Sequence, residues 1–453
     1  MKILISIGTL GLGGAEKQAV WLANKLSADH DVTLLTYHGG LREIDISAGV
    51  DWKQIPTRQT KRVSEIDNGY LDVSSTLEVG RFFEDNKPRE SKRQTFKKTL
   101  IGLLRPFIPP EKRNLVQRNF VKIVVRTRHL NNFLKKATRY LLLKATSAVQ
   151  ILLLQGYRQK FISYYHPYKF TRSLIKESKA DLVVTFLFHD TLLVGLSAIL
   201  SRKRPKIIVG RRSPIGYGDD TRTRTQRKLL KFVYFFSDLG ISNSKYNNSS
   251  AVADGLLERK IRVIHNYIED TNSRLISNST ETFELLCISN FFEYKNHENF
   301  IRAVADSHFD SPYHVTFLGD GPLKTNIELL ARKLGVNADF YSHEQQFNLT
   351  NIAVDYLVVP SFVEGNSNSL LEGLASGIPA IVTRVGLVEE LELMGAPLVI
   401  AEGFDCTSLQ KSLLTAFDEV VSNKKQAADF KSHIVSEFGE DAIIRKWEKA
   451  LGL

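Results

Sequence analysis

The sequence has little cysteine, no long uncharged apolar run and no metal-ligand pattern. Its 453 residues include two cysteines, Cys287 and Cys406, which are too few for a disulfide framework and lack zinc-site spacing. No uncharged apolar stretch reaches the roughly 18 residues that a spanning helix needs. The nearest candidate, residues 140–154, is shorter and contains Lys144. The first residues are typical of a strand rather than a secretion signal. We therefore expect a protein of the reducing cytoplasm.

Acidic residues are scarce in one segment, which supplies all of the net charge of +12. Residues 87–179 carry 23 Lys/Arg and three Asp/Glu, whereas the rest of the chain has 38 Lys/Arg and 46 Asp/Glu. Between residues 116 and 141, apolar side chains recur at helical spacing among Lys and Arg. The segment fits a solvated helical face, a nucleic-acid binder or a surface that docks on anionic lipid. We favour lipid, because no nucleic-acid motif accompanies the charge and the mixed pattern suits an interfacial helix.

Predicted strands and helices alternate in two series, and the length is sufficient for two cores. The first series has strands at 2–7, 31–36, 50–55, 181–186, 206–209 and 238–241, and the second at 285–288, 314–318, 355–359 and 380–382. This alternation predicts an α/β protein with two doubly wound, Rossmann-like domains.

Domain boundaries follow from the same pattern. We predict a first domain over residues 1–265, interrupted by a basic helical insertion at about 57–180. A second domain is predicted over 266–435, because polar residues cluster where the first series ends. Residues 436–453 are expected to form a helix that returns to the first domain.

Two glutamates, Glu364 and Glu372, stand eight positions apart around a small polar loop that leads into a predicted helix. The helix is expected to stop at Gly377 and Pro379, before a β-branched strand. N–H groups at a helix start hold anions, and carboxylates accept hydrogen bonds from hydroxyls. A nucleotide sugar offers both kinds of group. The alternative is structural: the run from Ser369 to Glu372 matches a capping box, and Glu364 would then be a solvated loop residue.

A glycine-rich loop, Gly11-Leu-Gly-Gly-Ala-Glu16, lies between the first predicted strand and helix. It fails as a dinucleotide-binding fingerprint, since the third glycine position holds Glu16 and no acidic residue ends the second strand. A generic tight turn remains the alternative.

These motifs together resemble the retaining, GT-B-fold glycosyltransferases of family 4, the glycosyl transferases group 1. The resemblance rests on the E-x7-E run at 364–372, the Gly-Gly-Ala-Glu loop at 13–16 and the strand-to-lysine segment at 285–295. Two departures stand out. Ser367 occupies a position where the family often has proline, and Asn290 stands where the family has a phosphate-binding arginine. The resemblance implies two facing domains with a cleft between them.

The resemblance also implies site roles. Glu364 would touch the transferred sugar, and Glu372 would hold the ribose hydroxyls of the donor. The remaining donor-binding candidates are the glycines of the loop, the matched lysine and the helix-start N–H groups: Gly13, Gly14, Lys295, Asn368, Ser369 and Leu370. For Lys295 the alternative is a solvated surface lysine. His189 follows a strand at its carboxyl end and is a catalytic candidate, with a capping or packing role as the alternative.

Other features have weaker implications. Gly319-Asp-Gly-Pro322 matches a family turn and equally fits a plain tight loop. Asn266 is expected to be structural, and Arg212 is a candidate to replace the charge missing at Asn290. Asp29-His-Asp31 is explained by turn chemistry, so we expect no metal and no cofactor.

The predicted function is transfer of a sugar from a nucleotide-diphosphate sugar to a hydroxyl acceptor, with retention. The acceptor is expected to be a glycan or a lipid-linked glycan in bacterial surface polysaccharide synthesis. The enzyme is expected to lie on the inner face of the cell membrane, attached peripherally through residues 87–179, and no nucleic-acid partner is expected. Two alternatives remain: a nucleotide-sugar epimerase of the same fold, and a non-catalytic membrane or nucleic-acid binder.

Overall fold

The computed structural model describes residues 1–11, 13–37, 44–55, 158–212, 224–269, 281–342 and 353–453. Most of the predicted insertion at 57–180 lies outside these ranges, and so does the basic segment 87–179 up to residue 157.

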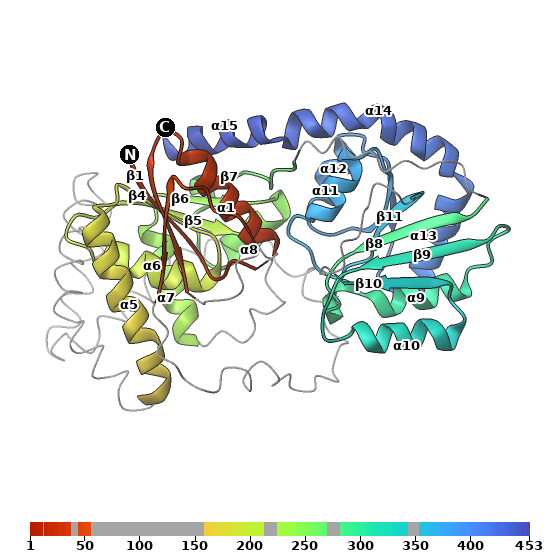
Figure 1. Cartoon of the computed structure of the whole chain (residues 1–453), viewed down its shortest axis with the longest axis horizontal. Coiled ribbons are helices and arrows are strands. Elements are labelled where there is room, and N and C mark those ends of the chain that lie inside the picture. The colour runs from red at the N-terminus through yellow and green to blue at the C-terminus, as the bar shows by residue number, and fades with distance from the viewer. Residues whose placement is uncertain (12, 38–43, 56–157, 213–223, 270–280, 343–352) are drawn as a thin grey trace, which may run out of the picture. The chain divides into compact units, whose positions relative to one another are not determined.

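A seven-stranded parallel sheet organises the first half of the chain, in the order β3-β2-β1-β4-β5-β6-β7 (Figure 1). Its strands are β1 (Lys2–Ile7), β2 (Asp31–Thr36), β3 (Val50–Gln54), β4 (Leu182–Thr185), β5 (Lys206–Arg211), β6 (Leu239–Ser242) and β7 (Ile261–Val263). The strand order reverses after β1, which is the doubly wound arrangement.

Each face of this sheet has its own apolar core, because successive strand residues point to opposite sides. Ile3, Ile5 and Ile7 of β1 join one cluster, and Leu4 joins the other. The helices that connect the strands are α1 (Gly14–Leu26), α5 (Arg158–Ser178), α6 (Phe188–Ile199), α7 (Arg224–Phe236) and α8 (Lys245–Ala253). Residues of α1 belong to the first cluster, and residues of α6 and α7 to the second.

A second parallel sheet, of six strands, has the order β10-β9-β8-β11-β12-β13. Its strands are β8 (Phe283–Ile288), β9 (Tyr313–Leu318), β10 (Ala338–Tyr341), β11 (Tyr356–Val359), β12 (Ala380–Thr383) and β13 (Leu398–Ala401). The reversal lies between β8 and β11, so the carboxyl ends of these two strands define the switch point where α/β sheets bind ligands.

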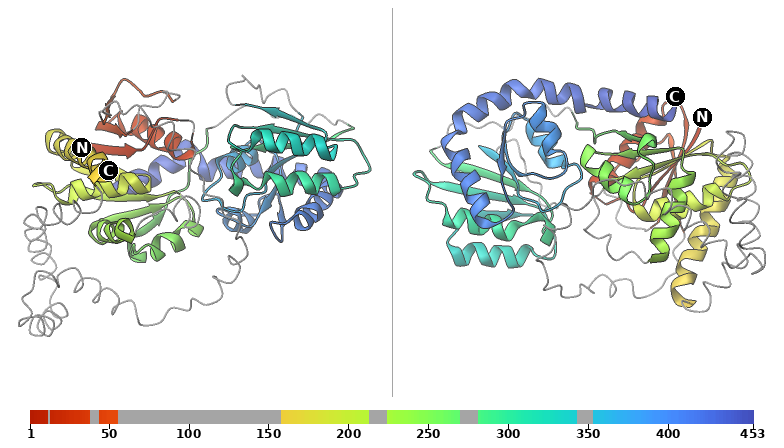
Figure 2. Two further views of the ribbon diagram at one scale, coloured as in Figure 1. Left: turned by 90° about the horizontal axis from the view of Figure 1, so that it is seen from below. Right: turned by 180° about the vertical axis from the view of Figure 1, so that it is seen from behind.

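Helices cover both faces of the second sheet (Figures 1 and 2). They are α9 (His297–Asp306), α10 (Lys324–Leu334), α11 (Asn368–Ala375), α12 (Val388–Leu393), α13 (Cys406–Asp418) and α14 (Val420–Phe438). Apolar residues of α9, α10 and α13 pack in one cluster, and those of α11, α12 and α14 in the other. The prediction of two doubly wound parallel sheets is therefore confirmed.

The last helix, α15 (Glu440–Leu451), packs on the first sheet, although α14 immediately before it packs on the second. Ile443, Trp447 and Leu451 of α15 are buried in the same cluster as β1. Trp447 stacks on Phe186 at the end of β4, with ring centroids 5.9 Å apart. Gly439 alone separates the two helices, so the chain passes from one core to the other within a single residue.

Candidate functional site

The loop before α11 places Ser367 as the cap of that helix. Its Oγ accepts a hydrogen bond from the Leu370 N–H at 3.4 Å, and its backbone is extended. The capping box from Ser369 to Glu372, our structural alternative, is wrong, because Ser369 is the second residue of the helix. Across the described residues, the N–H groups of Asn368 and Ser369 have no acceptor. These two donors are available to an anion at the start of α11.

Glu364, in the loop that leads to this helix, forms an ion pair with Lys295. Lys295 Nζ lies 2.5 Å from Glu364 Oε1, and the two side chains are 16% and 14% exposed. Ser361 Oγ donates a second hydrogen bond to Glu364 Oε1 at 3.2 Å. Burial disfavours the charge on Lys295, but the neighbouring carboxylate outweighs it and raises the pKa of the lysine. The alternative of a solvated surface lysine is therefore wrong.

The strand-to-helix loop that leads to Lys295 is held by the Gly-Asp-Gly-Pro turn after β9. The Phe291 N–H donates to the Asp320 carbonyl at 2.8 Å. Gly321 has φ +150°, and a Cβ there would lie 2.7 Å from the backbone of Phe291. The turn thus supports the loop through backbone packing, as its structural interpretation predicts. Asn290, which replaces the family arginine, lies exposed in this loop.

The glycine loop of the first sheet reaches the same place. Gly14 begins α1, and a Cβ on it would lie 3.1 Å from Asn368 Nδ2. Gly13 caps the helix, and a Cβ there would lie 2.3 Å from the carboxylate of Glu16, which folds back over it. Burial raises the pKa of Glu16, and a hydrogen bond from Thr9 Oγ1 at 3.1 Å opposes the shift. The structure therefore brings together Gly14 and Asn368, which begin helices that pack on two different sheets.

Glu372 lies one turn into α11 and is exposed. Even so, surrounding protein atoms remove part of its hydration and raise its pKa, with Lys17 opposing the shift and Glu269 adding to it. Lys17 belongs to α1, so Glu372 also faces the first sheet's glycine-loop helix. Its neighbour Tyr267 stacks on Trp21, with ring centroids 4.2 Å apart.

Arg212 lies at the end of β5 and is buried, with 9% of its surface exposed. Its guanidinium sits over the ring of Phe186, 4.7 Å from the centroid, and Nη1 donates to Asn266 Oδ1 at 3.1 Å. Asn266 Nδ2 in turn donates to Asn368 Oδ1 at 2.7 Å. Arg212 is thus connected to the start of α11 through Asn266.

Comparison with known proteins places this site in a family. Residues 269–434 match the family described as "Glycosyl transferases group 1". The match includes the ion pair, the cap and the whole of α11. This segment is similar to the group 1 glycosyltransferases.

Relatives and solved structures agree with the family. An α-1,4-N-acetyl-D-galactosaminyltransferase of Campylobacter jejuni, named for a GalNAc-containing undecaprenol-diphosphate acceptor, is 25% identical over 51% of this chain and 64% of its own. The N-acetyl-α-D-glucosaminyl L-malate synthase of Bacillus anthracis is 22% identical over 49% of this chain and 61% of its own. The chain thus spans about three fifths of these curated relatives.

Among solved structures, HepE of Anabaena in complex with UDP superposes over the full length of both chains with a TM-score of 0.62 and 12% identity. WaaG, a glycosyltransferase of lipopolysaccharide biosynthesis, gives a TM-score of 0.57 at 14% identity, also over both full chains. These likenesses, with the two parallel sheets, show that the chain has the GT-B fold.

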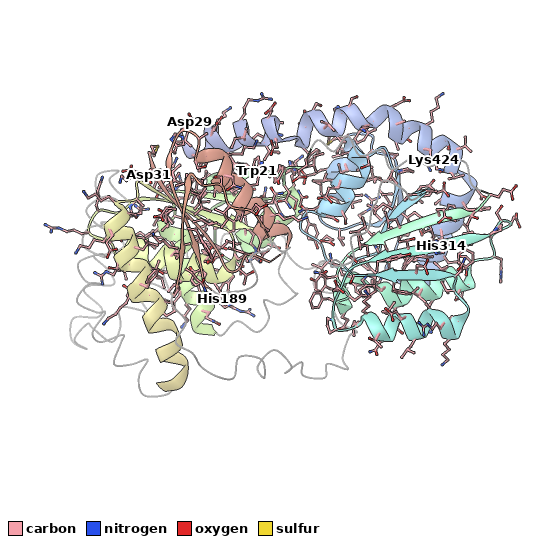
Figure 3. All side chains as sticks on the ribbon, in the orientation of Figure 1. Trp21, Asp29, Asp31, His189, His314 and Lys424 are labelled. Carbon is pink, nitrogen blue, oxygen red and sulfur yellow. The ribbon has the colours of Figure 1, made fainter. Side chains whose placement is uncertain are left out.

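His189 lies outside the segment that matches the family, as the second residue of α6 (Figure 3). Its ring packs edge-on against Phe188, with centroids 5.1 Å apart. In the described part of the chain, the hydrogen bonds of Glu364, Lys295 and Asn368 go to other residues. The structure therefore places His189 on a helix of the first sheet, outside the hydrogen bonds of Glu364, Lys295 and Asn368.

Asp190, next to His189, is a buried carboxylate that the sequence did not bring to attention. Its Oδ2 accepts from the Leu187 N–H at 3.1 Å, and its Oδ1 accepts from Ser6 Oγ at 3.3 Å. Ser6 Oγ also lies 3.3 Å from the hydroxyl of Tyr37. Burial raises the pKa of Asp190 to about 7, although the two hydrogen bonds oppose this. A detectable signal existed: an acid three residues after Leu187, the N-cap of α6, where its carboxylate can accept from the N-cap N–H.

Among the described residues, no group of three or more His, Cys, Asp or Glu could hold a metal ion. None of the helices described here is long and apolar enough to cross a membrane.

Proposed function

We propose that this protein transfers a sugar from a nucleoside-diphosphate sugar to a hydroxyl acceptor, with retention of the anomeric configuration. The observation that carries the proposal is the ion pair that Lys295 makes with Glu364, four residues before the unpaired N–H groups at the start of α11. A cation and helix-start donors suit a diphosphate, and a carboxylate within reach of them suits the attached sugar.

Each residue has a role in this proposal. The bond between the anomeric carbon and the diphosphate oxygen breaks, and the diphosphate takes the electron pair. Lys295 and the N–H groups of Asn368 and Ser369 bind the negative charge that develops there. Glu364 lies on the side of the sugar, where its carboxylate stabilises developing positive charge. The acceptor oxygen bonds to the anomeric carbon, and its proton passes to the departing diphosphate. These charges come from the chain itself, so we propose that no divalent metal is required.

Nucleotide recognition falls to Glu372. Replacing it by alanine is expected to weaken donor binding about 10- to 100-fold, since hydrogen bonds from ribose hydroxyls to a carboxylate contribute about 1.5–3 kcal/mol. The KM for the donor should rise while kcat stays close to wild type, measured by steady-state kinetics together with calorimetry.

Glu298→Ala is the matched control for Glu372, because Glu298 is an exposed helical glutamate that pairs with Arg302 on α9. The Glu298 variant should leave both kcat and the KM for the donor unchanged. If the Glu372 variant binds the donor as the control does, the carboxylate does not hold the nucleotide.

The acceptor is proposed to be a glycan or a lipid-linked glycan of the bacterial surface. Support comes from the Campylobacter relative, whose name specifies an undecaprenol-diphosphate-linked acceptor. We further propose that residues 87–179, with 23 Lys/Arg and three Asp/Glu, attach the enzyme to the inner face of the membrane. The protein should then sediment with vesicles containing phosphatidylglycerol, but not with purely zwitterionic vesicles or in high salt.

A panel of nucleotide sugars tests the reaction itself. The bound donor should raise the melting temperature by mass action. Incubation with that donor, an acceptor extract and a chelator should yield a product whose anomeric configuration, read by NMR, equals that of the donor. An isomerised sugar formed from donor alone would instead identify an epimerase.

A further inference from the structure

Arg212 is a buried cation with an incomplete set of partners. Its Nη1 donates to Asn266, its guanidinium covers Phe186, and its Nε is buried without a partner in the described part of the chain. Burial lowers the pKa of Arg212 to about 9, so the side chain remains protonated at neutral pH. Nearby, α11 begins with Asn368, which belongs to the other sheet. A buried charge is thus connected through Asn266 to the helix start that forms the candidate anion site.

The link from Arg212 to Asn368 has a fixed direction. A guanidinium only donates hydrogen bonds, so the Asn266 atom that faces it must be the oxygen. The Asn266 atom that faces Asn368, 2.7 Å away, is then the amide nitrogen, and the Asn368 atom that receives it must be an oxygen. The remaining group of Asn368, its Nδ2, is turned toward Gly14. The charge on Arg212 therefore fixes the orientation of both amides.

We infer that Arg212 and Asn266 are positioning residues that aim Asn368 Nδ2 at a phosphate oxygen bound at the start of α11. This inference rests on the proposed function and deepens it. The groups at the start of α11 are donors: Asn368 Nδ2 and the N–H groups of Asn368 and Ser369. Such a set selects an anion. Asn290 carries no charge in the loop after β8, and Arg212 compensates through Asn266 rather than by touching the ligand itself.

Asn266→Asp separates this role from a structural one. The new carboxylate still accepts from Arg212 and gains an ion pair, but it cannot donate to Asn368. The Asn368 amide must then reverse, which presents its oxygen to the phosphate. The unfolding free energy should be retained or increased, whereas the affinity for a nucleoside diphosphate should fall about tenfold or more. A purely structural asparagine would not move these two quantities in opposite directions.

The measurement uses calorimetry on the full chain. UDP, GDP, ADP and dTDP are titrated into the wild type. The diphosphate that binds most tightly and its parent nucleoside are then each titrated into the variants. Asn368→Asp keeps the acceptor toward Asn266 but loses the Nδ2 donor, so it should show the same loss for the diphosphate and none for the nucleoside. Asn337→Asp, which adds the same charge at an exposed position before β10, is the control and should bind as wild type.

Each outcome decides something. Wild-type affinity in both site variants overturns the positioning role and leaves the proposed function standing. An equal loss for nucleoside and diphosphate also overturns it, because the effect then does not concern phosphate. If the wild-type protein binds none of the four diphosphates, both the inference and the proposed function fail.

Discussion

Replacing Glu364 by alanine is expected to abolish sugar transfer, with kcat reduced about 10³-fold. Removing one preorganised charged group from a reacting centre typically costs 10²–10³ in rate. Here the same group also holds Lys295 Nζ through its Oε1, so the variant loses the orientation of the lysine as well. Steady-state kinetics with a saturating donor measure the effect. Glu392→Ala is the control, since Glu392 also pairs with a cation, Arg384, but both of those side chains are exposed.

In the Glu364→Ala variant, a loss of folding stability must be distinguished from a loss of catalysis. Breaking a buried ion pair by removing one partner destabilises a protein by about 3–5 kcal/mol, because the other charge is left unpaired. The double variant Glu364→Ala/Lys295→Met removes both charges and should remain inactive. Its unfolding free energy, measured with urea, should recover much of what the single variant loses. Turnover near the wild-type rate in either variant would contradict the role of Glu364.

The second large effect concerns pH and Asp190. Burial raises the pKa of this carboxyl to about 7 in the folded protein, against 3.8 for an ordinary aspartate. Between these values the folded state holds a proton that the unfolded state has released. The unfolding free energy therefore falls as pH rises from about 4 to 7, by up to about 1.4 kcal/mol per pH unit. Below that window the carboxyl is protonated in both states and has no effect.

Asp190→Asn should remove this part of the pH dependence. The amide keeps an oxygen for the Leu187 N–H and offers a donor toward Ser6, so the packing is retained. Urea unfolding at half-unit intervals from pH 5 to 8 should show the variant gaining stability relative to wild type as pH increases. Asp310→Asn, in an exposed loop, should follow the wild type. Parallel curves for wild type and the Asp190 variant would contradict the prediction.

Strands inside the two sheets were predictable from sequence, whereas three of the four edge strands in the described part of the chain were not. Runs such as Lys2–Ile7 and Leu182–Thr185 are nearly uniform in apolar residues, which is typical of central parallel strands. β7, β10 and β13 escaped prediction. β7 has three residues, β10 is an edge strand without a fully buried side chain, and β13 has four residues, two of them partly exposed. In such strands, position in the sheet rather than local pattern decides the structure.

The candidate site was likewise predictable from the sequence only in part. The helix start at Asn368 followed from the motif, because local turn chemistry specifies it. Its place beside the glycine loop followed from the resemblance. The structural alternative placed the cap at the wrong serine, since Ser367 and Ser369 have equal chemistry and only backbone conformation distinguishes them. The contact of Asp190 with Ser6 and the link from Arg212 through Asn266 depend on residues far apart in sequence. No single-sequence pattern carries that information.

The packing of α15 has a consequence for how the protein is made. Strand β1 precedes α15 in the chain and leaves the ribosome before it, but the apolar cluster of β1 also needs Ile443, Trp447 and Leu451. Until those residues are synthesised, one face of the first sheet has no cover over this patch, and nascent chains with exposed apolar surface are prone to misassembly. The first sheet is therefore begun before the second sheet is synthesised and completed only after it.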